Sequence, residues 1–76
     1  MNKQRRIILR EILDRLTDLH DELDNVRDEE ECAKDNLPES FWETERYERM
    51  EEACENLESA LSSLEEAFEY IDAAME

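Results

Sequence analysis

The sequence predicts an all-α protein, an antiparallel two-helix coiled-coil hairpin that dimerises into a four-helix bundle. Glycine is absent, Pro38 is the only proline among 76 residues, and 43% of the residues are charged, a composition typical of long helices. Apolar residues recur at alternating steps of three and four on both sides of Pro38. This spacing keeps one face of a helix against another. The two runs are similar in length, as a closed hairpin requires.

The first helix is expected over about residues 3–35. Its apolar stripe comprises Leu9, Ile12, Leu16, Leu19, Leu23, Val26, Glu30 and Ala33. Pro38 ends this helix, because proline lacks a backbone donor and disfavours helical geometry in the preceding residue. The turn is expected over about residues 36–43, and residues 1–76 form a single domain.

The second helix is expected over about residues 44–75. Ser40 and Glu43 fit a capping box, in which each side chain satisfies the other's backbone donor. The alternative is that Thr44 is the cap and that residues 38–43 form a short turn of their own. The stripe of this helix comprises Tyr47, Met50, Cys54, Leu57, Leu61, Leu64, Phe68, Ile71 and Met75.

Folding the chain about residue 40 sets the expected register. It pairs Leu9 with Ile71, Leu16 with Leu64, and Leu23 with Leu57. Along one flank the same fold brings basic or titratable groups to acids. These expected pairs are Arg6 with Asp72, His20 with Glu58, and Arg27 with Glu51.

The other flank of the second helix carries an alanine at every seventh residue. Small residues let another helix approach closely, so the apolar surface of this helix is wider than one seam needs. We expect a homodimer that packs through Ile8, Ala53, Ala60, Ala67 and Ala74. The alternative is a monomer in which long charged side chains cover the alanines.

The sequence offers no chemistry for catalysis, so no enzyme activity, catalytic residue, metal site or cofactor is expected. His20 is the single histidine, and the absence of glycine removes phosphate loops and calcium loops. Cys32 and Cys54 are expected several helical turns apart and therefore free, which fits a reducing compartment. The N-terminal apolar run is too short for a signal peptide, and no membrane-spanning run follows. A cytoplasmic protein without membrane contact is expected.

The net charge of −15 is concentrated after residue 10. Such a charge disfavours nucleic acid as a partner and favours a protein partner with a basic surface. The expected acidic contact residues are Asp14, Asp21, Asp28, Asp35, Glu48, Glu52 and Glu55. The alternative is that the acids only keep the protein in solution.

Two aromatic residues, Phe41 and Trp42, lie next to the turn. Aromatic side chains at such a position either close the end of a helical bundle or anchor a partner. Trp42 is therefore a candidate anchor.

Several segments resemble small helical proteins that phages and mobile elements of Gram-positive bacteria carry. The segments are Arg27-Asp28-Glu29-Glu30-Glu31, Asp35-Asn36-Leu37-Pro38-Glu39-Ser40, Glu45-Arg46-Tyr47 and Met50-Glu51-Glu52-Ala53. The resemblance implies an anti-CRISPR-like or anti-restriction-like inhibitor, acting in the cytoplasm of a bacterial host.

The functional expectation is thus a binding protein with a nucleic-acid-mimicking acidic surface, which blocks a basic site on a host nucleic-acid-binding protein. The alternative is a structural or assembly module that self-associates through its alanine-lined face.

Overall fold

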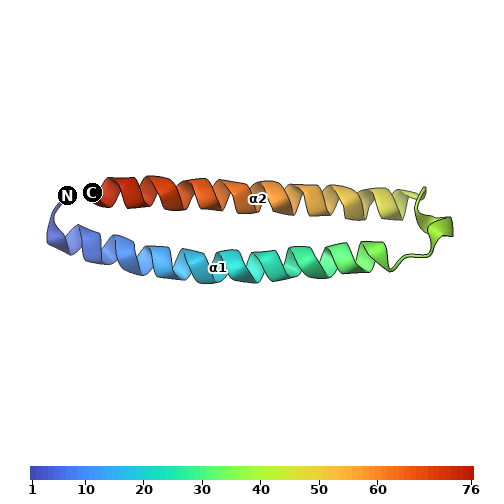
Figure 1. Ribbon diagram of the computed structural model, residues 1–76, viewed down its shortest axis with the longest axis horizontal. Helices are drawn as coiled ribbons and strands as arrows, with labels where there is room; N and C mark the ends of the chain where they lie inside the picture. Colours follow the sequence, from blue (N-terminus) through green and yellow to red (C-terminus); the bar gives the residue numbers. More distant parts are fainter.

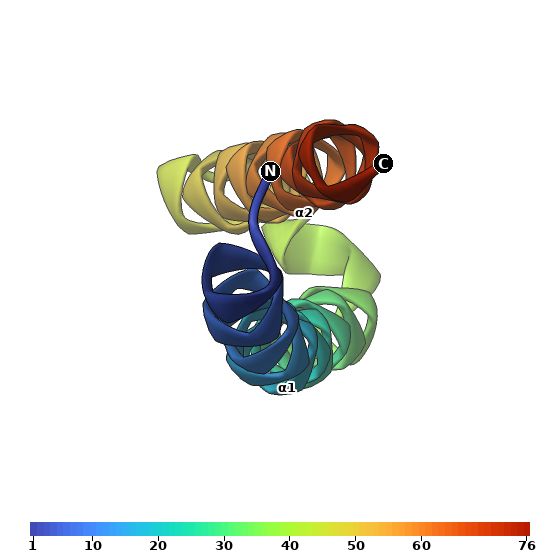
Figure 2. The same ribbon diagram turned by 90° about the vertical axis from the view of Figure 1, so that its left-hand side faces the viewer.

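The computed structural model describes residues 1–76 and consists of two long antiparallel helices joined by a short turn (Figure 1). Helix α1 spans Lys3–Asp35, the 3-10 turn η1 spans Glu39–Phe41, and helix α2 spans Glu45–Met75. The all-helical class and the packing of two helices agree with the sequence prediction. The two termini lie at the same end of the hairpin (Figures 1 and 2).

The protein is a rod rather than a globule. Its extents are 59 × 15 × 12 Å and its radius of gyration is 17.4 Å, whereas a globular chain of this length would have a radius of about 11 Å. Only Cys54 and Leu61, both on α2, are buried. The core is therefore one line of side chains between two helices.

Each helix begins at a side-chain cap. The Asn2 Oδ1 atom accepts a hydrogen bond of 2.9 Å from the Arg5 backbone N–H, and Thr44 Oγ1 accepts one of 3.4 Å from the Tyr47 N–H. These bonds satisfy donors that the first helical turn leaves free. Thr44, rather than the expected Ser40, caps α2.

The Ser40 prediction is wrong because Pro38 starts a separate turn. The N–H groups of Phe41 and Trp42 donate to the carbonyls of Pro38 and Glu39. Ser40 therefore lies inside η1, before the chain reaches the extended backbone of the Thr44 cap.

The stripe of α2 faces α1 as expected, since all nine of its members from Tyr47 to Met75 are buried or half-buried. The stripe of α1 does so only in part. Leu9, Leu16 and Leu23 are half-buried, but Leu19 and Val26 are 56% and 51% exposed. His20 and Arg27 instead extend toward α2, so α1 is rotated from the expected orientation.

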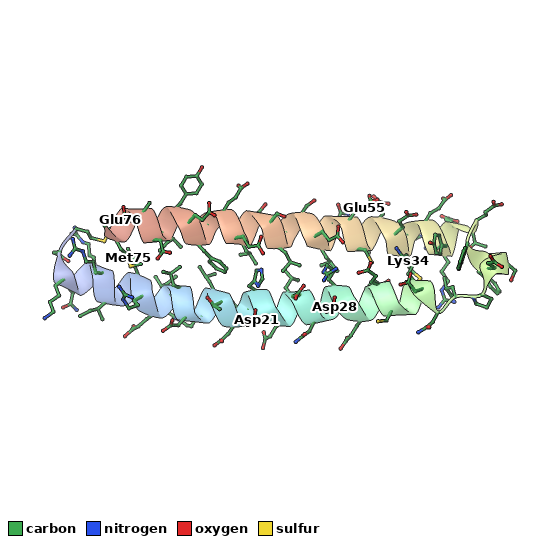
Figure 3. All side chains as sticks on the ribbon, viewed as in Figure 1. Asp21, Asp28, Lys34, Glu55, Met75 and Glu76 are labelled. Atoms are coloured by element: carbon green, nitrogen blue, oxygen red, sulfur yellow. The ribbon has the colours of Figure 1, made fainter.

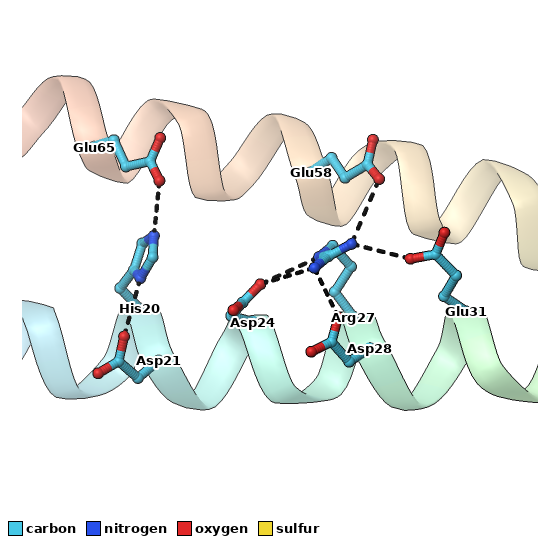
Figure 4. Close-up of polar contacts among 8 residues, drawn as sticks. All are labelled: His20, Asp21, Asp24, Arg27, Asp28, Glu31, Glu58 and Glu65. Carbon is cyan, nitrogen blue, oxygen red and sulfur yellow. Dashed lines mark hydrogen bonds and ion pairs between the residues drawn. The ribbon is translucent and has the colours of Figure 1, made fainter.

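The expected contacts along the charged flank are also wrong. His20 contacts Glu65 rather than Glu58, and Arg27 contacts Glu58 rather than Glu51 (Figure 4). Each contact thus falls one heptad further along α2 than expected. The charge pattern repeats every seven residues, so both registers join cations to acids.

Candidate functional site

The hairpin has two different long sides, and His20 and Arg27 identify one of them. Both side chains reach from α1 to a row of acids on α2 that comprises Glu51, Glu58, Glu65 and Asp72. We call this the acidic side. Further acids flank this row on both helices, and carboxylate oxygens line the hairpin in Figure 3. They are Asp14, Asp21, Asp24, Asp28, Glu31 and Asp35 on α1, and Glu48, Glu55 and Glu69 on α2.

His20 lies between two carboxylates. Its Nε2 atom is 3.2 Å from Glu65 Oε1, and its Nδ1 atom is 3.4 Å from Asp21 Oδ1 (Figure 4). The hydrogen bond to Asp21 raises the pKa of His20, partial burial opposes it, and the bond to Glu65 raises the pKa again. The ring also packs at 5.7 Å from the ring of Phe68. With a carboxylate at each nitrogen, the geometry favours the imidazolium form.

Arg27 contacts four carboxylates in the middle of the acidic side. Its guanidinium donates to Asp24 at 3.1 Å, Asp28 at 2.7 Å and Glu31 at 3.0 Å, and it lies 3.7 Å from Glu58 (Figure 4). The hydrogen bond to Asp24 is the largest cause that raises the pKa of Arg27. One cation therefore neutralises part of a dense group of acids and links the helices.

The expected acidic contact residues are all exposed, but they differ in their partners. Asp21 and Asp28 pair with His20 and Arg27. The others lie within ion-pair distance of no cation in the chain, which leaves their charge available to another molecule. These unpaired carboxylates belong to Asp14, Asp35, Glu48, Glu52 and Glu55. Glu52 lies on the back of α2, and the other four lie on the acidic side.

The opposite side of the hairpin is apolar. Leu19 and Val26 precede His20 and Arg27, and therefore point about 100° away around α1. On α2, Ala60 follows Glu58 by two residues and Ala67 follows Glu65 by two, so both point about 200° from those acids. We call this the apolar side. Its α1 members are Ile8, Ile12, Leu19, Val26 and Ala33, and its α2 members are Ala53, Ala60, Ala67 and Ala74.

The residues expected at the dimer face all lie on this apolar side. Ile8 is 46% exposed, Ala60 and Ala74 are exposed, and Ala53 and Ala67 are half-buried. The apolar spacing predicts Leu19 and Val26 in the intramolecular seam, whereas the structure exposes both on the apolar side. The cationic residues directly after them, which match the acids of α2, are the signal that could have revealed it.

Trp42 belongs to the turn. Its Nε1 atom donates a 2.9 Å hydrogen bond to the Leu37 carbonyl, and its ring stacks on Tyr47 at 6.1 Å between centroids. The Lys34 ammonium lies 5.9 Å from the centre of the same Tyr47 ring. Trp42 is nevertheless 44% exposed and the neighbouring Phe41 49% exposed. The Trp42 side chain thus stabilises the turn, while part of its ring remains exposed to solvent.

The two cysteines of the chain differ in exposure. Cys32 is an exposed free thiol, whereas Cys54 is buried, and burial raises the pKa of the Cys54 thiol. No group of His, Cys, Asp or Glu side chains is arranged to hold a metal ion. Neither helix has a stretch apolar enough to cross a bilayer.

No family model, curated protein or solved structure matches the chain.

Proposed function

We propose that the protein is a non-enzymatic binding protein whose acidic side occupies a basic, nucleic-acid-binding surface of another protein. One observation carries the proposal: the unpaired carboxylates of Asp14, Asp35, Glu48 and Glu55 lie on one side of the rod. A partner rich in Lys and Arg would supply the cations that these groups lack within the chain.

The spacing of charge supports this choice of partner. A net charge of −15 over a length of 59 Å is about one charge per 4 Å, close to the ~3.4 Å spacing of charges along one strand of duplex DNA. A cleft that binds a nucleic-acid strand would meet a comparable line of negative charge. The resemblance to small phage and mobile-element proteins gives the proposal its specific form, an inhibitor of a host nucleic-acid-handling protein.

Affinity chromatography with matched variants tests the proposal. The wild-type protein is immobilised, exposed to a nuclease-treated bacterial lysate at low salt, and eluted with excess duplex DNA or with increasing salt. Captured proteins are identified by mass spectrometry. We expect nucleic-acid-binding proteins that DNA displaces, with binding that falls steeply as salt rises.

The variant Asp14→Lys/Glu55→Lys reverses two unpaired acids, one on each helix. The control Glu11→Lys/Glu66→Lys makes the same change in net charge with two exposed acids on the outer faces of the hairpin, one on each helix. Loss of capture by the first variant and retention by the second would support an acidic-side contact. Equal behaviour of the two variants, or capture that neither salt nor DNA reverses, would contradict it.

Self-association through the alanine row belongs to the same proposal, as the means by which two rods form one four-helix bundle. Should the acidic-side contact fail its test, the apolar side still favours an assembly module, in which the acids serve solubility alone.

A further inference from the structure

We propose that the apolar side binds a second copy of this chain, so that α1 of each copy lies over α2 of its partner. The two copies are related by a two-fold axis parallel to the helices. This inference defines the interface and its orientation, and it does not depend on whether the acidic side binds a basic partner.

The distribution of charge sets the apolar side apart. The faces of α2 that point to this side carry Arg46, Arg49, Ala53, Asn56, Ala60, Ser63, Ala67, Tyr70 and Ala74, without one carboxylate. On α1 the acids on or next to this side are Glu22, Glu29 and Glu30, which Arg5 and Arg15 balance in part. A chain with a net charge of −15 would repel its own copy through most of its surface, but not through this side.

Exposed apolar side chains are concentrated on the same side. Leu19 and Val26 are 56% and 51% exposed, and Tyr70 at its edge is 76% exposed. At the end nearest the termini, a shallow depression of about 190 Å³ is lined by Met1, Arg5, Ile8 and Leu9. Contiguous apolar surface of this kind is uncommon on a monomer and marks an interaction site.

The chain exposes more surface than a globular monomer of its mass, and the excess is similar to the area that each subunit buries in a stable dimer. Its accessible surface is 5939 Å² at a mass of 9.1 kDa, whereas a globular monomer of that mass would expose about 4,900 Å². The excess is about 1,000 Å², and a stable interface buries about 800 Å² on each partner. With only Cys54 and Leu61 buried inside the hairpin, a second layer would supply the missing core.

The position of each residue along the long axis of the hairpin determines how the two copies are oriented. Because Arg27 faces Glu58 and His20 faces Glu65, Val26 is level with Ala60 and Leu19 with Ala67. The same steps of seven residues bring Ile12 level with Ala74 and Ala33 with Ala53. With α1 over the α2 of the partner, each large side chain of α1 meets an alanine of the partner, which allows close packing.

The charged edges agree with this orientation. Beside the apolar contacts, Arg15 would lie near the Tyr70 ring of the second copy, Glu22 near Ser63, and Glu29 near Asn56. No like charges meet. The other two-fold arrangement, with α1 over an antiparallel α1, would bring the large apolar residues of one α1 against those of the other.

Molecular mass in solution tests the interface. By sedimentation equilibrium at micromolar concentration we expect the wild-type mass to be twice 9.1 kDa. Ala60→Glu/Ala67→Glu should raise the dissociation constant about 100-fold or more, because it buries unpaired charges. The control Ser59→Glu/Ser62→Glu adds the same charge to the outer faces of α2 and should remain dimeric.

A second variant separates loss of association from loss of folding. Leu19→Gln/Val26→Gln changes side chains that the isolated hairpin already exposes, so its helical circular dichroism should persist while its mass halves. A monomeric wild-type protein, or a dimer that survives both interface variants, would overturn the interface. Neither result depends on capture of a basic partner.

Cross-linking tests the orientation in a Cys32→Ser background, where the remaining Cys54 is buried. Chains with Val26→Cys and chains with Ala60→Cys are mixed and treated with a short bis-maleimide. The proposed arrangement gives a product that joins residue 26 of one chain to residue 60 of the other. Absence of that product from a dimeric sample would rule the orientation out.

Discussion

The Arg27 guanidinium on α1 lies 3.7 Å from the Glu58 carboxylate on α2, and this contact defines which turns of the two helices face each other. His20 and Glu65, one heptad further along, repeat the relationship at 3.2 Å. Both contacts lie across the seam from the exposed Leu19 and Val26, and they mark the division of the hairpin into an acidic side and an apolar side.

A double-mutant cycle should therefore detect coupling between Arg27 and Glu58. We expect Arg27→Gln and Glu58→Gln to be non-additive in their effect on the free energy of unfolding, since each removes the partner of the other. Arg27→Gln and Glu51→Gln should be additive. Coupling with Glu51 instead of Glu58, measured by urea denaturation, would restore the register expected from the sequence.

His20 should make stability depend on pH. Because its pKa is raised in the folded protein, protonated His20 stabilises the fold below the ordinary histidine pKa of about 6.5. That contribution is lost as the pH rises through the folded-state pKa. The difference in melting temperature between wild type and His20→Gln should therefore shrink from pH 6 to pH 8. A difference that grows over this range would contradict the His20 contacts, and Glu65→Gln should weaken the dependence.

The start of α2 offers a direct comparison of two caps. Thr44→Ala should lower the free energy of unfolding by about 1 kcal/mol, since the Tyr47 N–H loses its acceptor. Ser40→Ala, inside η1 without a capping bond, should change it by less than about 0.5 kcal/mol. Thermal denaturation of both variants at equal protein concentration measures the difference, and a larger effect at Ser40 would indicate a capping box.

The two cysteines should differ in their reaction with a thiol reagent. Cys32 is exposed, whereas Cys54 is 4% exposed and burial raises its pKa, so little Cys54 thiolate forms at neutral pH. Stopped-flow labelling should show one fast thiol and one that reacts only when the hairpin opens. Cys32→Ser should remove the fast phase, and urea should merge the phases in the wild type. Two fast phases in the native protein would mean that the seam around Cys54 is open.

Leu61 should contribute most to the core of α2. At 7% exposed it is one of two buried residues, so Leu61→Ala should cost about 2–3 kcal/mol of stability. Ser59→Ala, on the outer face of the same helix, should change stability by less than about 0.5 kcal/mol. Urea denaturation of both variants at equal concentration tests the contrast. Similar losses in the two variants would indicate that α2 does not pack on α1 through Leu61.

The sequence predicts the helices well because their ends depend on local chemistry. Pro38 interrupts the backbone hydrogen bonds, and Asn2 and Thr44 cap the segments that follow them. Register and rotation depend on contacts between distant residues. A shift of one heptad still joins Arg27 to a glutamate, so periodicity alone cannot choose between Glu51 and Glu58.

The two candidate surfaces are likewise predicted only in part from the sequence. The carboxylates and the alanine row are visible in the sequence, because each repeats with the heptad. The membership of Leu19 and Val26 in the apolar side is not visible, because it requires the rotation that His20 and Arg27 impose on α1. Likewise, only the three-dimensional structure shows that Asp21 and Asp28 lie next to cations, whereas Asp14 and Glu55 do not.

The two termini lie side by side at one end of the rod (Figure 1), and this gives the hairpin a particular mechanical response. A force that pulls the termini apart would load the layers between α1 and α2 one after another, from the terminal end toward the turn at Pro38. The ion pair of His20 would break before that of Arg27, and the braced ring of Trp42 would yield last. The hairpin would therefore open like a zipper at low force, rather than resist as a rod loaded along its length.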